Sequence, residues 1–281
     1  MNILLTGGNG FIGKHIRNAL SSKYTILAPS SQELNLLNKN QIYEFFKLHN
    51  INLIIHSASA GVRIMPTDTY DKVALPNLIM FNNLAEMVNT KIPMITLGSG
   101  AEYDKKLDLL KVKEDFFGKS IPSDPYGYSK YQISKSIEGL DNILNLRIFG
   151  VFGLNEDRSR VTSYILNSYI NRKPILLNQN VLFDFIWITD FCRVVDYFIL
   201  NKTKDKFINV TPTESIEILT IANLVNSFSS YHVPVQFKQK GIGNSYTGDN
   251  ALLLKNIVDF KFTPYEVSLK KFYFSLLKES K

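Results

Sequence analysis

The sequence predicts an α/β fold: a doubly wound parallel sheet with a smaller C-terminal lobe. Two observations support this prediction. Short apolar runs of strand length alternate with segments of helical periodicity, and glycine- or serine-rich turns directly follow several of these runs. Strands that alternate with helices at this spacing pair in parallel through right-handed crossovers. The turns are therefore expected at one edge of the sheet, where such folds bind their ligands.

The first turn predicts a diphosphate site. Residues 1–5 form a short, mainly apolar run that suits a buried strand, and Thr6-Gly7-Gly8-Asn9-Gly10-Phe11-Ile12-Gly13 follows where a helical pattern begins. Its Gly-x-x-Gly-x-x-Gly spacing is one residue wider at the first gap than the usual dinucleotide motif. Glycines let the backbone approach phosphates, and a helix N-terminus presents free N–H groups and partial positive charge. We therefore expect a nucleotide here, and a turn with only a structural role is the alternative.

The end of the second expected strand, Tyr24–Ala28, bears on the choice of cofactor. In dinucleotide folds an acidic residue at this point selects NAD by binding the ribose 2′-hydroxyl. In this chain Pro29, Ser30 and Ser31 follow, and the first carboxylate is Glu33. The sequence therefore favours NADP, with the two serines donating to its 2′-phosphate, and leaves NAD as the alternative.

Two further strands are expected to bring small-residue turns to the same edge. The next predicted elements are a helix at Asn40–Leu48, a strand at Leu53–His56, a helix at Leu75–Thr90 and a strand at Met94–Leu97. Ser57–Gly61 follows one strand and Ser99 the other, so both should face the glycine turn. His56 is expected to be a hydrogen-bonded core residue. The charged segment Lys105–Ser123 is expected to be a loop or lid.

A tyrosine and a lysine four residues apart are candidates for proton transfer. Asp124-Pro125 opens a helical pattern in which Tyr126 and Lys130 share a face. A nearby ammonium favours the phenolate, which lowers a tyrosine pKa from about 10 and suits the phenol to proton transfer near neutral pH. Tyr131 and Lys135 have the same spacing but lie about 140° further round the helix. We favour Tyr126 because the preceding turn places it at the helix entrance.

Together these motifs resemble the extended short-chain dehydrogenase/reductase family of nucleotide-sugar epimerases, dehydratases and reductases. The resemblance rests on the glycine turn, Ser99 and Tyr126-x-x-x-Lys130, and it spans nearly the whole chain. Phe183–Asp190 is similar to the family's Arg-Asp-Phe-Ile-His-Val-Asp-Asp segment, and Phe207–Val210 is similar to its next strand. The resemblance implies a Rossmann-like NADP-binding domain at 1–153 and about 188–212, with a substrate-binding lobe at 154–187 and 213–281.

The resemblance also implies roles for individual residues. Tyr126 would be the general acid/base, Lys130 would bind the nicotinamide ribose and tune the tyrosine, and Ser99 would hydrogen-bond the reacting oxygen. The cofactor would move a hydride to or from a sugar carbon. The implied cofactor-binding residues are Gly7, Gly10, Phe11, Ile12, Gly13, Ser30, Ser31, Ser57, Ala58, Asn77, Tyr126 and Lys130. The candidates for substrate contact are Ser99, Gly100 and Arg160.

Within the family the pattern is most similar to the GDP-fucose synthase-like nucleotide-sugar 4-ketoreductases. The dehydratases carry Thr-Asp-Glu where this chain has Ser99-Gly100-Ala101, so elimination of water is not expected. That branch epimerises its substrate with a Cys and a His, whose positions here are Ala101 and Arg160. The resemblance therefore implies NADPH-dependent C4 reduction of a GDP-linked 4-keto-6-deoxy sugar, without epimerisation, for surface polysaccharide biosynthesis.

Three points stay open at the level of sequence. A 4-epimerase with tightly bound NAD is a second enzymatic reading, and a non-catalytic NADP-binding scaffold or sensor is a reading of another class. Arg160 either binds substrate phosphate or is a surface arginine on a loop. Arg147, at a strand end in a family motif, is expected to be structural.

Composition limits the partners. Among 281 residues, 32 Lys and Arg exceed 25 Asp and Glu without forming a basic stripe, so nucleic acid is not expected. Cys192 is the single cysteine and the four histidines lie at no zinc-ligand spacing, so neither a disulfide nor a metal is expected. We expect no membrane partner and a cytoplasmic location, because membrane-length apolar spans and a signal-like N-terminus are lacking.

The family resemblance implies a homodimer formed through the helices at 75–90 and 126–140.

Overall fold

The computed structural model describes residues 1–61, 67–88 and 92–279. The chain separates into two compact units, each built from more than one segment. The first unit comprises Met1–Lys106, Lys113–Ile148 and Cys192–Asn209. The second comprises Leu107–Val112, Phe149–Phe191 and Val210–Lys281.

The first unit is built on a six-stranded sheet. Its strands are β1 (Asn2–Thr6), β2 (Thr25–Leu27), β3 (Leu53–His56), β4 (Met94–Ser99), β6 (Ile143–Ile148) and β11 (Phe207–Val210), in the spatial order β11-β6-β4-β3-β1-β2. The pairings β1–β2, β1–β3, β3–β4 and β4–β6 are parallel. The chain runs outward from β1 to β2 and then returns to β3 on the other side, so the strand order reverses between β1 and β3. That reversal is where open α/β sheets bind ligands.

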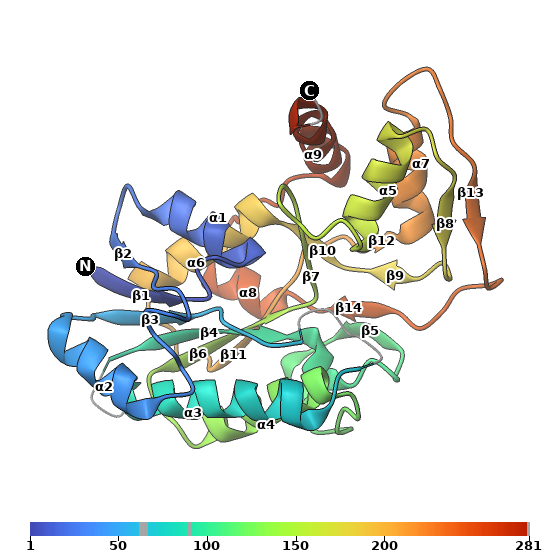
Figure 1. Cartoon of the computed structure of the whole chain (residues 1–281). Helices are drawn as coiled ribbons and strands as arrows, with labels where there is room; N and C mark the ends of the chain where they lie inside the picture. The colour runs from blue at the N-terminus through green and yellow to red at the C-terminus, as the bar shows by residue number, and fades with distance from the viewer. Residues whose placement is uncertain (62–66, 89–91, 280–281) are drawn as a thin grey trace. The chain divides into compact units, whose positions relative to one another are not determined.

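Helices cover both faces of this sheet (Figure 1). Figure 1 shows α2 (Lys39–Leu48), α3 (Leu75–Val88) and α4 (Pro125–Glu138) on one face, with α1 (Phe11–Leu20) and α6 (Ile188–Leu200) on the other. Leu4 and Ile54 of the sheet pack with Phe81 of α3 and Ile137 of α4 in one buried cluster. The apolar runs of the strands are buried because helices lie on both sides. The predicted α/β fold with a doubly wound parallel sheet is confirmed.

Most element boundaries agree with the expectations to within a few residues. The helix predicted at 75–90 is α3, and a π turn at Tyr70–Ala74 leads into it. The expected end of this helix, at Thr90, lies outside the described residues. The helix predicted from Tyr126 is α4, which begins one residue earlier because Asp124 caps it and Pro125 occupies its first turn.

The second unit contains short strands and four helices among its described residues. The strands are β5 (Leu109–Val112), β7 (Gly150–Phe152), β8 (Ile175–Leu177), β9 (Leu182–Phe183), β10 (Phe185–Trp187), β12 (Ile216–Glu217), β13 (Val235–Phe237) and β14 (Tyr246–Gly248). The helices are α5 (Val161–Ile170), α7 (Ile218–Asn226), α8 (Ala251–Asn256) and α9 (Tyr265–Glu279). β12, β9, β14 and β5 form one sheet, and β10–β7 and β13–β8 form two-stranded sheets.

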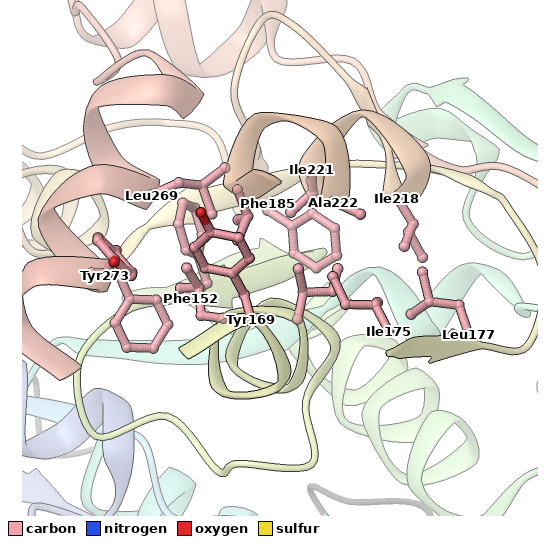
Figure 2. Packing of buried hydrophobic residues seen from close by; sticks show 14 of the residues in the cluster. Phe152, Tyr169, Ile175, Leu177, Phe185, Ile218, Ile221, Ala222, Leu269 and Tyr273 are labelled. Carbon is pink, nitrogen blue, oxygen red and sulfur yellow. The ribbon is translucent and has the colours of Figure 1, made fainter. Parts of the chain in front are cut away.

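An aromatic and aliphatic cluster forms the core of this unit (Figure 2). Figure 2 shows the rings of Tyr169 and Tyr273 close to Leu269, and Ile218 facing the side chains of β8. Tyr169 of α5 and Tyr273 of α9 meet edge to face, with ring centroids 5.9 Å apart. The unit therefore has a core of its own, made by α5, α7 and α9 packing together.

The prediction of a loop or lid over Lys105–Ser123 is wrong for part of this segment. Leu109–Val112 forms β5, which pairs with β14, and Leu109 and Val112 are buried. The strand is irregular, since Lys111 has a positive φ of 47° and the register shifts beside it. Its charged neighbours and a pairing partner more than a hundred residues downstream hid the strand from periodicity.

Candidate active site

The glycine turn between β1 and α1 is shaped as an anion-binding cradle. Gly7 has φ of 69°, and a Cβ there would lie 2.6 Å from the backbone N of Ala58. A Cβ on Gly13 would lie 2.2 Å from the Gly7 carbonyl oxygen, so the helix presses against the turn. Gly10, the N-cap of α1, provides no side-chain cap, and the first turn carries no acidic residue. The N–H groups that begin at Phe11 and Ile12 are therefore open to an anion.

A pocket of about 370 Å³ lies beside this cradle. Its lining comprises residues 6–10, 29–31 and 34–37 together with Ala58 and Met80. Four of these side chains, Leu34, Leu36, Leu37 and Met80, give it an apolar wall of the kind that suits a planar base. The sequence predicted Ser30 and Ser31 here but missed the apolar wall, because it is divided between a loop and α3.

Glu33 is engaged by its own turn. Its Oε2 accepts the Ser30 backbone N–H at 2.7 Å, and its N–H donates to the Ser30 Oγ at 3.3 Å. These bonds lower the pKa of the Glu33 carboxyl. Glu33, the first acidic residue after β2 in the sequence, is thus hydrogen-bonded to the backbone of Ser30. Among the described residues that line the pocket, none is Lys or Arg.

Asn77 links the turn after β3 to the start of α4. Its Oδ1 accepts the Ala60 N–H at 2.7 Å, and its Nδ2 donates to the Ala60 carbonyl and to the Ser129 Oγ, both at 3.1 Å. The Ser129 hydroxyl donates in turn to the Tyr126 carbonyl at 2.7 Å. Asn77 is 2% exposed. Its amide therefore holds the Ser57–Gly61 turn and the helix that carries Tyr126 in one arrangement.

Ser99 is the last residue of β4 and the cap of a 3-10 turn at Gly100–Tyr103. Its Oγ accepts the Ala101 N–H at 3.1 Å, while its own N–H donates to Oε1 of Glu102 at 2.9 Å. This reciprocal pair is a capping box. Sequence reasoning missed Glu102, although the Ser-x-x-Glu spacing that defines such a box was available to identify it.

Helix α4 is pressed against this turn. A Cβ on Gly127 would lie 3.0 Å from the Ala101 carbonyl oxygen and 2.7 Å from Oδ2 of Asp124, so only glycine lets the two segments approach so closely. The first turn of α4 therefore runs alongside the residues that follow Ser99. Tyr126 lies in that first turn, directly before Gly127.

Lys130 is buried beneath Tyr126. It is 6% exposed, its Nζ donates to the Leu97 carbonyl at 2.8 Å, and the same Nζ lies 5.8 Å from the centroid of the Tyr126 ring. Burial lowers the pKa of Lys130 to about 8, against the opposing charge of Glu102. A buried ammonium next to a phenol can favour its phenolate, which is the chemistry expected of this pair.

The competing pair faces elsewhere. Tyr131 is 8% exposed and stacks on Phe117, with ring centroids 4.7 Å apart. Lys135 is exposed and forms an ion pair with Glu138. Tyr131 is a packing residue, as expected from its position on the other side of α4.

His56 is a core residue, as expected. It is 3% exposed, and its Nδ1 lies 2.8 Å from Oγ1 of Thr6, which also accepts the Ala58 N–H at 3.3 Å. Burial, with a smaller effect from the charge of Lys130, lowers the pKa of His56 to about 3. The imidazole is therefore neutral at physiological pH and aligns β1 with the turn after β3.

Arg160 belongs to the second unit. It is the N-cap of α5, and its Nε lies 3.1 Å from Oε1 of Glu156, whose other oxygen accepts the Thr162 hydroxyl at 2.5 Å. Glu156 is 7% exposed, and burial raises its pKa to about 7. The guanidinium is half-exposed and ion-paired, which distinguishes it from an unattached surface arginine. Sequence reasoning missed Glu156.

The described part of the chain contains neither a helix suited to span a membrane nor a cluster of metal-ligating side chains. None of the helices within it combines the length and apolar character needed to cross a membrane. Within residues 1–61, 67–88 and 92–279, no three His, Cys, Asp or Glu side chains gather as a metal site would require.

The fold and the glycine turn define a dinucleotide-binding α/β protein, with Ser99 at the end of β4 and Tyr126 and Lys130 in α4. The family model for the NAD dependent epimerase/dehydratase family matches residues 3–211, and the chain belongs to this family. This confirms the resemblance found in the sequence.

The chain is similar to three proteins whose names contain a GDP-linked sugar. It is 33% identical over 141 residues to GDP-L-colitose synthase of Yersinia pseudotuberculosis, a match covering 48% of this chain and 46% of that protein. It is 23% identical to GDP-6-deoxy-D-talose 4-dehydrogenase of Aggregatibacter actinomycetemcomitans, over 99% of both chains. The solved GDP-mannoheptose C4 reductase of Campylobacter jejuni, with NADP bound, superposes with a TM-score of 0.84 at 16% identity, covering 98% of each chain.

Proposed function

We propose that this protein reduces the C4 keto group of a GDP-linked 4-keto-6-deoxy sugar with NADPH, without epimerising the sugar, in the synthesis of surface polysaccharide. The observation that carries the proposal is the buried Lys130 ammonium against the Tyr126 ring, in a helix held against the turn after Ser99. The names of the similar proteins support the GDP-linked sugar, and the NADP-bound reductase structure supports the cofactor.

The residues present fit NADP(H). The glycine turn offers N–H groups to its pyrophosphate, the adjacent pocket suits its adenosine half, and Ser30 and Ser31 would meet the 2′-phosphate. The Lys130 ammonium has three N–H donors, and one of them donates to the Leu97 carbonyl. The others would be available to hydrogen-bond the nicotinamide ribose. When bound, the cofactor supplies the hydride.

The protein's own residues then handle the proton. The Tyr126 phenol donates its proton to the C4 oxygen, and Lys130 stabilises the phenolate that results. The Ser99 hydroxyl hydrogen-bonds the same oxygen and orients the carbonyl. Asn77 supports the reaction indirectly, because it fixes the helix that carries Tyr126.

The absence of epimerisation follows from two side chains. Ala101 has no group that could remove a proton from carbon, and Arg160 is ion-paired to Glu156 and carries a guanidinium where the epimerising enzymes carry an imidazole. Arg160 is proposed instead to bind substrate phosphate. Reaction in D₂O tests this directly: the product should contain no solvent deuterium at C3 or C5, and mass spectrometry that finds deuterium there would refute a pure ketoreductase.

A 4-epimerase with tightly bound NAD is the second candidate. The observation in its favour is that no Lys or Arg is present among the described residues of the pocket lining, so the 2′-phosphate of NADP would meet only hydroxyls. An epimerase consumes no added cofactor, whereas the proposed reductase oxidises one NADPH for each product molecule. The stoichiometry of NADPH oxidation therefore separates the two.

We also propose that the protein is a homodimer formed through α3 and α4. Tyr70 and Leu75, just before and at the start of α3, are large apolar residues left exposed, and Tyr70 packs edge to face against Tyr128 of α4. Sedimentation equilibrium tests this: a dimer is expected for the wild type, and a monomer over the micromolar range would contradict the proposal.

A further inference from the structure

Glu102 is a charged group at the centre of the first unit that the proposed reaction does not use. It is fully buried in the turn after Ser99. Its Oε1 accepts the Ser99 N–H at 2.9 Å, and its Oε2 accepts the Nε–H of Arg147 at 2.7 Å and the hydroxyl of Ser134. A single carboxylate thus joins β4, β6 and α4.

The surroundings of Glu102 are built for a carboxylate. A Cβ on Gly98 would lie 2.6 Å from Oε1 of Glu102 and 2.1 Å from Oδ1 of Asn145, so glycine is needed for the carboxylate to approach the strand. Arg147 is 1% exposed and is held between the rings of Phe117 and Phe207, at 4.6 and 4.5 Å. A guanidinium buried in this way requires an anion, and Glu102 is that anion.

The carboxylate reaches the proposed catalytic residues along two routes. Through Ser99 it fixes the backbone at the end of β4. Through the Ser134 hydroxyl it is hydrogen-bonded to α4. Tyr126, Lys130 and Ser134 follow one another at intervals of one helical turn, so the three side chains share a helix face. Its charge also acts on Lys130 by raising a pKa that burial lowers.

We propose that Glu102 is a positioning residue of the active site, which fixes Ser99 and α4 relative to each other through its bonds to the Ser99 N–H and the Ser134 hydroxyl. From this position its charge also supports the Lys130 ammonium. This inference rests on the proposed ketoreductase function. It goes beyond that function because Glu102 acts through other residues and touches neither the substrate nor the cofactor in the proposed reaction.

Other charged or titratable groups contribute to the same environment. Arg147 comes from β6, His56 from β3, Tyr103 and Lys105 from the turn after β4, and Glu114 from the segment before α4. His56 is neutral, and the ring of Tyr126 has both Lys105 and Lys130 within 5.8 Å of its centroid. Among the described residues, the carboxylate whose charge raises the Lys130 pKa is that of Glu102.

The test compares Glu102→Gln with Glu114→Gln. Both remove a carboxylate from a residue that Arg147 bonds, but Arg147 bonds the side chain of Glu102 and the backbone carbonyl of Glu114, whose carboxylate accepts the Asn209 N–H. In Glu102→Gln the Lys130 ammonium loses its supporting charge, so the alkaline limb of the kcat–pH profile should move down by about one pH unit. At pH 8 this lowers kcat about five-fold relative to wild type, and at pH 6 the two should agree within about three-fold. Glu114→Gln should keep the wild-type profile.

A second readout needs no turnover. Competitive labelling of Lys130 with acetic anhydride, followed by mass spectrometry across pH, reports its pKa directly in the free protein. The pKa should be lower in Glu102→Gln than in the wild type. If the wild type reduces no 4-keto sugar, the proposed function fails, and the labelling still decides whether Glu102 sustains the Lys130 charge. An unchanged pKa and an unchanged kcat–pH profile in folded Glu102→Gln would overturn the inference.

Because Glu102→Gln leaves the Arg147 guanidinium without its anion and can prevent folding, Ser134→Ala is the second variant. It keeps both charges and removes the hydroxyl that donates to the Glu102 carboxylate and accepts from Nδ2 of Asn145. Its kcat should fall about five-fold, with the Kd for NADPH changed less than three-fold and the Lys130 labelling pKa unchanged. Wild-type kcat in Ser134→Ala would overturn the positioning role in α4.

Discussion

At the scale of single residues, burial decides which ionisable groups can do chemistry. Lys130 and His56 are both buried in the first unit, but their surroundings give them different roles. Lys130 donates to a carbonyl and lies under an aromatic ring, whereas His56 is neutral and bonded to Thr6. The sequence predicted Tyr126 and Lys130 from their spacing and from the turn that precedes Tyr126. The Ser-x-x-Glu spacing could have identified the capping box of Glu102, but not its bonds to Ser134 and Arg147, which are distant in sequence and converge only in the fold.

Tyr126→Phe tests the assignment of the acid. Loss of the phenol removes the proton donor, so kcat should fall by about 10²- to 10⁴-fold while NADPH affinity, measured by fluorescence titration, changes less than three-fold. Tyr131→Phe is the matched control and should keep near wild-type kcat, because Tyr131 stacks on Phe117. The reverse outcome for the two variants would show that the wrong tyrosine was chosen.

His56 predicts an acid-dependent loss of stability. Its folded-state pKa of about 3 lies below the ordinary value of 6.5, so below pH 6.5 the unfolded chain binds a proton that the folded chain does not. This contribution is complete above pH 6.5 and is lost as the pH falls towards 3, at up to about 1.4 kcal/mol per pH unit. Urea unfolding between pH 7 and 4.5 measures the slope. The slope should flatten in His56→Asn and persist in His232→Asn, and an unchanged slope in His56→Asn would refute the assignment.

At the scale of elements, close contacts between backbone segments shape the site. The alternation of strands and helices, the glycine turn and the helix entrance at Asp124 could all be predicted, since each leaves a local pattern in the sequence. The strand β5 could not, because its partner β14 is remote and Lys111 interrupts its alternation. The apolar wall of the cofactor pocket was missed for the same reason, since its residues come from separate elements.

Gly13→Ala tests the cradle. Its Cβ would lie 2.2 Å from the Gly7 carbonyl oxygen, so α1 must move away from the turn. We expect NADPH affinity to fall at least about ten-fold by fluorescence titration, because the N–H groups lose their arrangement. Gly139→Ala is the control: its Cβ would meet only the Ser136 carbonyl oxygen, at an ordinary 3.9 Å, and affinity should not change. Equal affinities in the two variants would argue against the cradle.

At the scale of the whole molecule, the chain forms two units with separate cores. The core of the second unit combines aromatic and aliphatic side chains, and its α9 carries one buried and one exposed phenylalanine, Phe272 and Phe274. Of its helices, α7 and α9 carry an apolar periodicity that is visible in the sequence. Its short strands could not be predicted, because two- and three-residue strands are too brief to show alternation.

Phe272→Ala should destabilise the protein by about 3–5 kcal/mol, because Phe272 is fully buried and its removal leaves a cavity. The control is Phe274→Ala, two residues along the same helix, where the side chain is 57% exposed. That variant should remain within about 0.5 kcal/mol of wild type. Urea unfolding monitored by circular dichroism measures both, and equal losses would contradict the packing described for α9.

The central claim is that the protein is an NADPH-dependent 4-ketoreductase. The most direct test follows the absorbance of NADPH with GDP-, dTDP-, UDP- and CDP-linked 4-keto-6-deoxy sugars, with NADH in parallel. We expect oxidation of NADPH with the GDP-linked substrate, one equivalent per product, and slower oxidation of NADH. No oxidation across the panel, together with NAD retained by the purified protein and interconversion of C4 epimers, would contradict the claim and establish the epimerase instead.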